Sequence, residues 1–231
     1  MGPDRPGPHL HGALHAMTDI YVLGSGPTLT FIDPDFFTGK TVIATNTVGE
    51  RLGLYTREVR LFTHSHYQWE DTYPLAEKYP NHFFWVPEGH RGFAGTPGRT
   101  DLVNVFHYPH QPTVYDFTVE KAWPPEGGLI VGSTSLHGSM HLACKLGARN
   151  MILVGADCGM IDGAANQAGY QSGNLVNDDT MMWLGRWEQH LREVKAALTE
   201  RYGVRIYSLN PFLNLNLEGH TWTGPDGSHN R

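Results

Sequence analysis

Residues 20–27, Ile20-Tyr21-Val22-Leu23-Gly24-Ser25-Gly26-Pro27, decide the fold class of this chain. Four apolar residues predict a short strand, and the glycines that follow predict a turn. Such a turn lets backbone N–H groups approach a phosphate, and a helix that begins after it adds a favourable dipole. The spacing matches neither the dinucleotide fingerprint nor the Walker A loop. On this stretch alone, a phosphate-binding turn and an ordinary turn that feeds a helix are equally good interpretations.

The segments that follow place this strand in a parallel sheet. We predict a helix from Thr28, with Ile32 and Phe36 on one face. Residues 41–44 and 59–63 predict two more strands, which end at polar residues 45–47 and 64–66. Strands separated by crossovers of this length form parallel sheets, and such sheets bind ligands at the ends of their strands.

The rest of the chain continues the alternation of strands and helices. Residues 128–131 and 151–154 are apolar, and the helix between them is rich in small residues. The predicted strands are 83–86, 102–106, 128–131, 151–154 and 204–209, and the predicted helices are 136–146 and 180–202. We therefore predict an α/β protein with a single Rossmann-like domain over residues 17–231. Its mostly parallel sheet is flanked by helices, and residues 1–16 form a flexible extension.

Residues 159–179 form the predicted lid. They are rich in Gly, Asn and Asp and lack periodicity, and a structureless stretch of this length inside a domain is usually functional. The segment ends at Asp178-Asp179, where capping of the next helix accounts for at least one of the acids.

Composition restricts the partners. The chain has 231 residues and a formal net charge of −6, which argues against sequence-blind binding to nucleic acid. It contains no apolar run long enough to span a membrane, so we expect no membrane span. With only two cysteines, a reducing compartment is the simpler interpretation, and we expect a cytoplasmic location.

Three polar turns are candidate ligand sites. Residues 133–135, Ser-Thr-Ser, lie between a strand and a helix, where hydroxyls cap the helix or bind an anion. Asp157 ends a buried strand and could hold a ribose hydroxyl, a metal or a positive group, or could make an Asx turn. Asn46 has the same kind of position and could bind a base or sugar.

The histidines give a weaker signal. His64-Ser65-His66 has two imidazoles, but an H-x-H pair without further spaced ligands does not predict zinc, and we expect no metal site. We predict instead that His64 is a polar pocket residue that exchanges protons near neutral pH. We expect His107, His110 and His137 mostly on the surface or in loops.

Several of these segments resemble a known family. Residues 20–29, 32–33 and 42–46 are similar to the start of the bacterial sialyltransferases of glycosyltransferase family 42. The same pattern occurs in the related 6-hydroxymethylpterin diphosphokinase-like family. Residues 133–135, 146–148 and 152–157 resemble the second block of these proteins, and residues 195–211 resemble their closing helix and strand.

The resemblance implies a function and a set of site residues. It implies transfer of a sugar from a CMP-sialic-acid-like donor to a hydroxyl of a glycan or small molecule, without a tightly bound cofactor. A homo-oligomer is a further implication. The implied nucleotide-binding residues are Gly24, Ser25, Gly26, Asn46, Thr134, Ser135 and Asp157, together with Tyr170 in the lid, and His64 matches a polar pocket position.

One departure from the family concerns the catalytic base. The sialyltransferases carry a general-base histidine at the start of the closing helix, and this chain has Met182 there. Asp178 or Asp179 could substitute, since the transfer needs a base within reach of the acceptor hydroxyl. Two alternatives stay open: a diphosphokinase-like phosphotransferase that uses ATP and Mg²⁺, and a nucleotide-binding module without catalysis.

Overall fold

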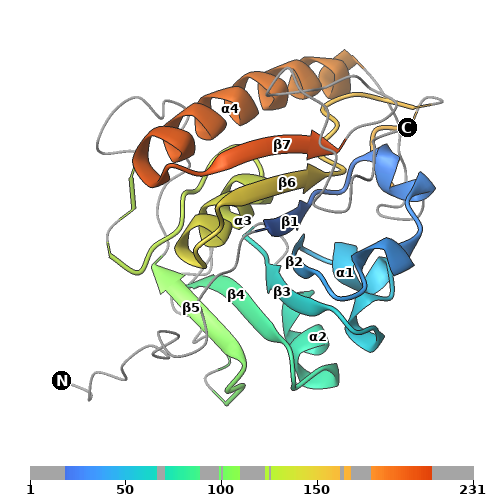
Figure 1. Ribbon diagram of the computed structural model, residues 1–231, viewed down its shortest axis with the longest axis vertical. Coiled ribbons are helices and arrows are strands. Elements are labelled where there is room, and N and C mark those ends of the chain that lie inside the picture. The colour runs from blue at the N-terminus through green and yellow to red at the C-terminus, as the bar shows by residue number, and fades with distance from the viewer. Residues whose placement is uncertain are drawn as a thin grey trace.

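A parallel sheet of seven strands forms the centre of the described residues (Figure 1). The computed structural model describes residues 19–66, 71–88, 99, 101–109, 123–124, 126–161, 164–167 and 178–209. The strands are β1 (Asp19–Leu23), β2 (Thr41–Thr45), β3 (Arg60–His64), β4 (Phe83–Glu88), β5 (Val105–Pro109), β6 (Asn150–Val154) and β7 (Arg205–Leu209). The predicted α/β fold with a parallel sheet is confirmed. The predicted extension, residues 1–16, lies outside the described residues.

The strand order creates a switch point beside β1. The order across the sheet is β5-β4-β3-β2-β1-β6-β7. The chain builds outward from β1 to β5 and then returns to pair β6 with the other edge of β1, where Val22 lies between Ile43 and Leu153. At such a reversal the connections after β1 and β6 leave in opposite directions, and ligands bind outside the carboxyl ends of the two strands.

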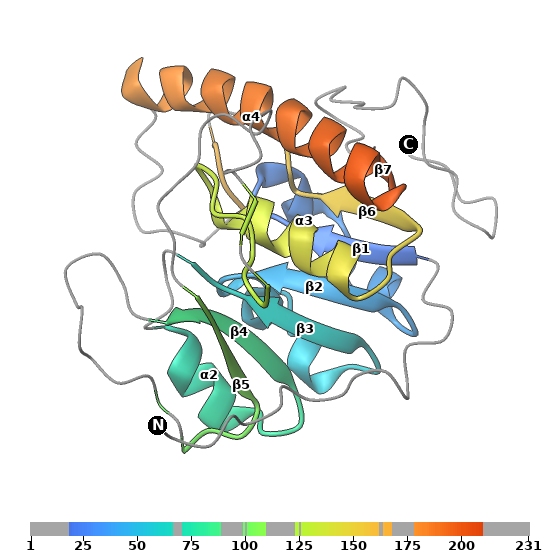
Figure 2. The same ribbon diagram turned by 90° about the vertical axis from the view of Figure 1, so that its left-hand side faces the viewer.

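Alternating residues of each strand face two different helical layers. Ile20 and Val22 face α3 (Ser135–Lys145) and α4 (Asp178–Tyr202), which cover one side of the sheet in Figure 2. Tyr21 and Leu23 face the opposite layer, which contains α1 (Val48–Arg51) and α2 (Thr72–Lys78). Burial of each large aliphatic side chain contributes about 1.5–3 kcal/mol, so the central strands hold both layers in place.

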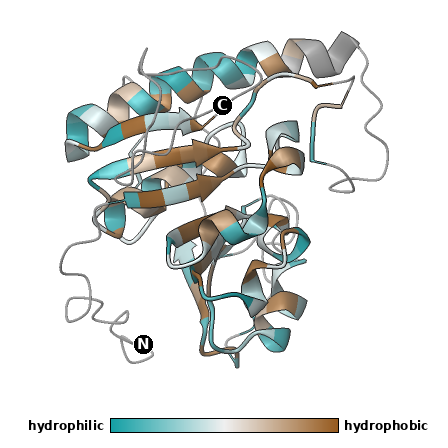
Figure 3. Ribbon diagram, turned by 45° about the vertical axis from the view of Figure 1, so that its right-hand side comes forward, coloured by the Kyte–Doolittle hydropathy of each residue, from teal (hydrophilic) through white to brown (hydrophobic). Residues whose placement is uncertain are grey.

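Helix α4 has the amphipathic pattern that its sequence predicts. Leu191, Val194 and Leu198 are buried against the sheet and α3, as expected for one stripe at helical spacing. Figure 3 shows hydrophilic residues along much of the remaining surface of this helix and hydrophobic residues along the central strands. The predicted helix over 180–202 is therefore confirmed, and its buried face includes these three positions.

The predicted strand at residues 128–131 is wrong. Leu129, Ile130 and Val131 are each only 2% exposed, but none belongs to a strand. The Ile130 N–H donates to His141 Nδ1 of α3 at 3.0 Å, so a side chain satisfies this backbone group in place of a neighbouring strand. The apolar run predicts burial correctly, but burial here comes from packing on α3.

The helix predicted from Thr28 is two short 3-10 turns, η2 (Pro27–Phe31) and η3 (Pro34–Phe37). The first turn ends at Phe31 because Ile32 is extended, and Pro34, which has no N–H to donate, keeps the preceding Asp33 extended as well. Asp33 then caps the second turn, because its side chain accepts from the Asp35 N–H at 2.9 Å. The helices α1 and α2 and the 3-10 turn η4 (Leu54–Thr56) were not predicted, since each is too short for a periodic signal.

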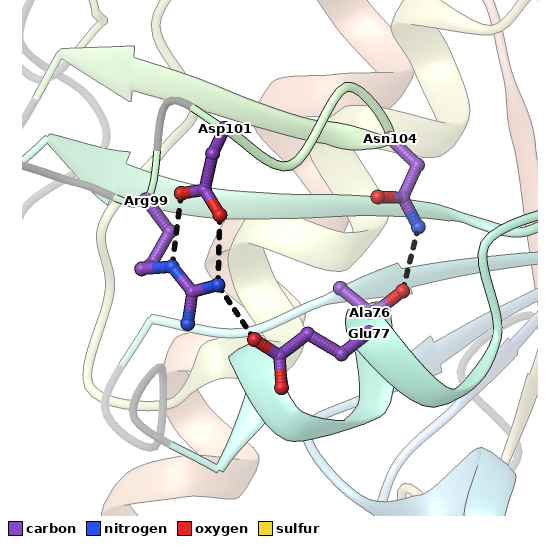
Figure 4. A network of polar contacts seen from close by, with 5 residues as sticks. All are labelled: Ala76, Glu77, Arg99, Asp101 and Asn104. Carbon is purple, nitrogen blue, oxygen red and sulfur yellow. Dashed lines mark hydrogen bonds and ion pairs between the residues drawn. The ribbon is translucent and has the colours of Figure 1, made fainter.

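A polar network fastens the outer strands to α2 (Figure 4). The Arg99 guanidinium donates to both carboxylate oxygens of Asp101, at 2.9 and 2.8 Å, and to Glu77 at 2.6 Å. The Asn104 side chain donates to the Ala76 carbonyl at 3.1 Å. Because β4 and β5 lie three and four positions from β1 in the sheet, we assign this network to the fold and not to the ligand site.

Two observations on the described residues concern the predictions about a membrane span and about the cysteines. None of their helices combines the length and apolar character that a membrane crossing requires. Both cysteines, Cys144 and Cys158, are free thiols.

Candidate functional site

A cavity of about 260 Å³ lies at the switch point between β1 and β6. It is bounded by the carboxyl ends of β1, β2 and β6, by the first turn of α3 and by α4. Of the residues predicted to bind a nucleotide, those that line it are Gly24, Ser25, Gly26, Asn46, Thr134, Ser135 and Asp157. Residues more than a hundred positions apart in the sequence therefore meet at one site. Tyr170 lies outside the described residues.

The cavity has a polar wall and an apolar wall. The polar wall carries hydroxyls and amides from the strand ends and from the start of α3. The apolar wall comes mainly from α3 and α4, with Leu136, Leu184, Trp187 and Leu191. A site of this kind suits a ligand with an apolar ring and a polar edge, because the aromatic and aliphatic side chains bury the ring while the polar groups fix its orientation.

The glycine turn after β1 packs directly against the turn after β6. The Gly24 N–H donates to the Val154 carbonyl at 2.9 Å, and the Gly26 N–H donates to the Gly155 carbonyl at 2.7 Å. A Cβ at Gly24 would lie 2.5 Å from the Gly155 oxygen, and a Cβ at Gly26 would lie 2.6 Å from the same atom and would also clash with Asp157. The two glycines are therefore required by the contact between the strand ends, a role that the phosphate interpretation did not include.

Asp157 connects the two turns. Its carboxylate is 4% exposed and accepts the Thr28 N–H at 2.8 Å and the Thr28 hydroxyl at 2.5 and 2.7 Å. Hydrogen bonds to an ionised group are about twice as strong as neutral ones, so this contact holds the turn after β1 in place. Asp157 lines the cavity, but its carboxylate is already engaged by Thr28.

The described part of the predicted lid lies against the glycine turn. The Ser25 hydroxyl donates to Asn166 Oδ1 at 2.9 Å, and the Gln167 N–H donates to the Ser25 carbonyl at 2.7 Å. Ala165 and Asn166 line the cavity. Ala165 and Asn166 therefore contribute to the wall of the site, and residues 162–163 and 168–177 of the predicted lid lie outside the described residues.

The start of α3 offers hydrogen-bond donors to the cavity. Thr134 is the N-cap residue of this 11-residue helix, but its hydroxyl makes no capping bond. The hydroxyl oxygen is buried and has no hydrogen-bond partner among the described residues. A buried hydroxyl without a partner costs about 1–3 kcal/mol, and the positive end of the helix dipole lies beside it. This combination is suited to an anionic or hydrogen-bonding ligand.

His137 lies at the cavity, although we expected it on the surface or in a loop. It is 1% exposed, it lines the cavity from the first turn of α3, and a Cβ at Gly132 would clash with its ring. Burial lowers the pKa of His137 to about 3, and repulsion from His190 adds to this shift. His190 of α4 lies behind the cavity wall, where its Nδ1 is 2.8 Å from the hydroxyl oxygen of Ser133. The signal missed in the sequence is the position of His137 in the first turn of a helix that follows a polar turn.

His64 does not belong to the described lining, contrary to the prediction of a pocket residue. It is fully buried beneath α3, with Nδ1 2.9 Å from the Ser139 oxygen and Nε2 3.0 Å from the Tyr108 hydroxyl. Burial lowers its pKa to about 3, so it is neutral at physiological pH and does not titrate there. In its place Thr45, the last residue of β2, reaches the cavity.

Two residues of the lining have an unusual backbone conformation. Asn46 has φ of 55° and Cys158 has φ of 48°, the left-handed region that non-glycine residues rarely adopt. Among the described residues, these are the non-glycine positions with positive φ, and both line the cavity. The Asn46 amide is further fixed because its Oδ1 accepts from the buried Ser65 hydroxyl at 2.9 Å. Backbone conformations of this kind cluster at ligand sites.

The described lining carries little charge. It contains no Lys or Arg, and Asp157 is its one carboxylate. The predicted lid, residues 159–179, contributes no Lys or Arg from its sequence either. Burial raises the pKa of the Cys158 thiol to about 12, so that thiol is neutral. Within the described residues, no group of His, Cys, Asp and Glu could hold a metal ion on its own.

The acids predicted as the catalytic base lie in the first turn of α4. Asp178 and Asp179 begin this helix, and their side chains lie outside the description. The same helix lines the cavity further along, from Leu184 to Leu191. At a rise of about 1.5 Å per residue, Asp179 is roughly 7.5 Å along the axis from Leu184. Met182, which replaces the family histidine, is 45% exposed.

Comparisons of the chain with models of protein families, with curated proteins and with solved structures found no match. The likeness to glycosyltransferase family 42 therefore stays a prediction from the residues quoted above. The fold and the cavity are established independently of it.

Proposed function

We propose that the chain is a glycosyltransferase that takes its sugar from a nucleoside-monophosphate-linked donor, such as CMP-sialic acid. The observation that carries the proposal is the cavity at the β1–β6 switch point. Thr134, the N-cap residue of α3, lines this cavity, and its hydroxyl is buried and has no partner among the described residues. Open α/β sheets bind nucleotides at this position, and a helix N-terminus is a ready anion site.

The charge of the site supports a donor with one phosphate. A CMP-linked sugar carries a single negative charge on its phosphodiester, which hydroxyls and the α3 dipole can stabilise. ATP carries about four negative charges, and sites for it normally supply Lys or Arg and carboxylates for Mg²⁺. The described lining has no Lys or Arg, and its one carboxylate is engaged by Thr28. This observation favours glycosyl transfer over the diphosphokinase-like alternative.

The transfer also needs a base for the acceptor hydroxyl. Asp178 and Asp179 at the start of α4 stay our first candidates, because the same helix continues along the cavity. The hydrogen bond between His190 and Ser133 adds a second candidate, since Ser133 lines the cavity and could pass a proton to the imidazole. The hydroxyls of the α3 turn would stabilise the leaving phosphate.

Thermal unfolding of the full chain with a panel of nucleotides tests the donor class. We expect CMP and CMP-sialic acid to raise Tm, while ATP with Mg²⁺, UDP-sugars and GDP-sugars have smaller effects. A ligand at a hundred times its Kd stabilises by about 2.7 kcal/mol, which corresponds to roughly 5–10 °C in a chain of this size. Stabilisation by ATP with Mg²⁺ alone would favour the diphosphokinase-like reaction, and no stabilisation by any nucleotide would refute nucleotide binding.

Hydrolysis of the bound donor then separates an enzyme from a binding module. Wild type, Asp178→Asn, Asp179→Asn and His190→Asn are compared for CMP release at saturating donor. We expect one of the three variants to lose about a hundredfold or more in kcat. If wild type binds the donor but neither hydrolyses nor transfers it, the protein is better described as a non-catalytic nucleotide-binding module.

A further inference from the structure

A buried chain of polar side chains lies beneath the cavity, between β2, β3, β5 and α3. It begins at Thr45, which lines the cavity and whose hydroxyl oxygen is 2.8 Å from that of Ser139. Ser139 is in turn 2.9 Å from His64 Nδ1, and His64 Nε2 is 3.0 Å from the Tyr108 hydroxyl. The Tyr108 hydroxyl is also 2.9 Å from Nδ1 of His66. Each member is at most 5% exposed.

The direction of the hydrogen bonds follows from Ser139. Its hydroxyl contacts Thr45, His64 and the Ser135 carbonyl, the last at 3.3 Å. A hydroxyl has one proton, and a carbonyl oxygen can only accept. The three contacts can all be hydrogen bonds at the same time only in one way: the Ser139 hydroxyl donates to the Ser135 carbonyl and accepts from Thr45 and His64. The Thr45 hydroxyl must then donate its proton to Ser139.

The rest of the chain agrees with this direction. His64 is neutral, because burial lowers its pKa to about 3, and it therefore has one N–H. If Nδ1–H donates to Ser139, Nε2 must accept the Tyr108 proton, and the Tyr108 oxygen accepts from His66 Nδ1–H. In this direction all the contacts of the network are hydrogen bonds at once. If Ser139 donated to Thr45 instead, its contact with the Ser135 carbonyl would be lost.

From this network we infer that Thr45 acts on the bound ligand as a hydrogen-bond acceptor, so the site selects an N–H or O–H donor at that position. The inference rests on the proposed function for the identity of the ligand. In a nucleotide two groups have this chemistry, the amino group of the base and the 2′-hydroxyl of the ribose. A carbonyl or a fluorine in the same place would face the lone pairs of Thr45 and would be rejected.

Equilibrium binding of three probes tests the inference and separates the two sources. UMP replaces the amino group of CMP by a carbonyl and also carries a proton on N3, and 2′-deoxy-2′-fluoro-CMP replaces the 2′-hydroxyl by fluorine. The wild-type chain should bind CMP about tenfold or more tightly than one of these two probes, and the probe whose rejection disappears in Thr45→Val identifies the group that faces Thr45. Calorimetry on the full chain measures all three dissociation constants.

Three variants test the role of the network. Thr45→Val keeps the shape but removes the acceptor, so CMP should lose about tenfold and the preference should disappear. Thr45→Ser keeps the hydroxyl and should retain the preference. Ser139→Ala releases the Thr45 proton, so the rejected probe should bind about tenfold more tightly while CMP changes little. A loss of packing alone would weaken all three nucleotides together.

Each outcome decides the inference. Equal wild-type affinity for all three nucleotides, or a preference that survives in Thr45→Val, would overturn it. A Ser139→Ala variant that weakens CMP and the rejected probe equally would overturn the role of the network. If Ser139→Ala does not fold, the comparison of Thr45→Val with Thr45→Ser still decides the role of Thr45. Binding of none of the nucleotides would overturn the proposed function as well, whereas binding without a preference would overturn this inference alone.

Discussion

Replacement of Gly26 by Ala tests whether the glycine turn exists for the contact with β6. A Cβ at this position would lie 2.6 Å from the Gly155 oxygen, where ordinary contact begins at 3.4 Å, and would also clash with the Asp157 carboxylate. The two turns would have to separate by about 0.8 Å. That separation stretches the Gly26–Gly155 hydrogen bond of 2.7 Å and the Thr28–Asp157 bond of 2.8 Å beyond normal length.

The expected cost follows from these contacts. A lost backbone hydrogen bond costs about 1 kcal/mol, a weakened bond to a carboxylate about 1.5–3 kcal/mol, and overpacking about 1–3 kcal/mol. Partial relaxation reduces the sum, so we expect Gly26→Ala to lower the free energy of unfolding by about 3 kcal/mol. In a chain of this length that loss lowers Tm by roughly 6–12 °C.

Urea unfolding at pH 7.5 measures the change, with Gly185→Ala as the matched control. Gly185 lies in α4 with no heavy atom within 4 Å of an added Cβ, so Ala there should raise stability by up to about 1 kcal/mol. In a Thr28→Val background, Gly26→Ala should cost about 1 kcal/mol less, because the two substitutions disturb the same contact.

The result that would refute this reasoning is a Gly26→Ala variant as stable as wild type. If such a variant also failed to bind nucleotide, the glycine would serve the approach of a phosphate alone. That outcome would restore the interpretation that the sequence suggested first.

Three further predictions concern the buried histidines and the start of α3. Because His64, His137 and His141 have pKa values of about 3 when folded and near 6.5 when unfolded, the unfolded state binds more protons between these values; stability should therefore be nearly flat above about pH 7.5 and fall by about 4 kcal/mol in total from pH 7.5 to 5.5, and a flat urea profile over that range would contradict the burial. Tyr108→Phe leaves His64 and His66 without the shared hydroxyl and should cost about 2–4 kcal/mol in urea unfolding at pH 7.5, and a cost below 0.5 kcal/mol would mean that the network carries no energy. Thr134→Val removes a buried hydroxyl that has no described partner, so it should raise stability by about 1–3 kcal/mol but weaken CMP binding about tenfold in calorimetry; unchanged affinity would remove Thr134 from the site.

The sequence predicts most of the sheet because each central strand is a short apolar run that ends at a polar turn. Residues 20–23, 41–44 and 151–154 all lie in strands of the parallel sheet, and their polar ends meet at one cavity. The pattern fails at residues 128–131, since apolar character predicts burial but cannot tell a strand from a segment packed on a helix. It fails again after Pro27, where a second proline breaks the helical period.

The candidate site was predicted at its strand ends and missed on its helices. Asn46 and Asp157 follow strands in the sequence, so the rule for parallel sheets identifies them, whereas Thr134 follows a buried segment that is not a strand and reaches the cavity as the N-cap residue of α3. His137 and Trp187 line the cavity because α3 and α4 cross the same edge of the sheet. His64 is absent from the described lining because it lies beneath α3, where its ring contacts Ser139. Such orientations depend on helix packing, which a single sequence does not specify. The role of Gly26 was missed because its reason is the distance to Gly155, 129 residues away.

Calorimetric titration of CMP into the full chain, wild type and Ala165→Trp, tests the central claim most directly. Ala165 lines the cavity, so an indole at that position fills the space of the proposed nucleotide. Ala196→Trp, on the exposed face of α4, is the matched control. We predict one CMP per chain in wild type and in Ala196→Trp, and binding weakened at least about a hundredfold in Ala165→Trp. Equal binding by all three proteins would place the nucleotide elsewhere and would contradict the assignment of this cavity.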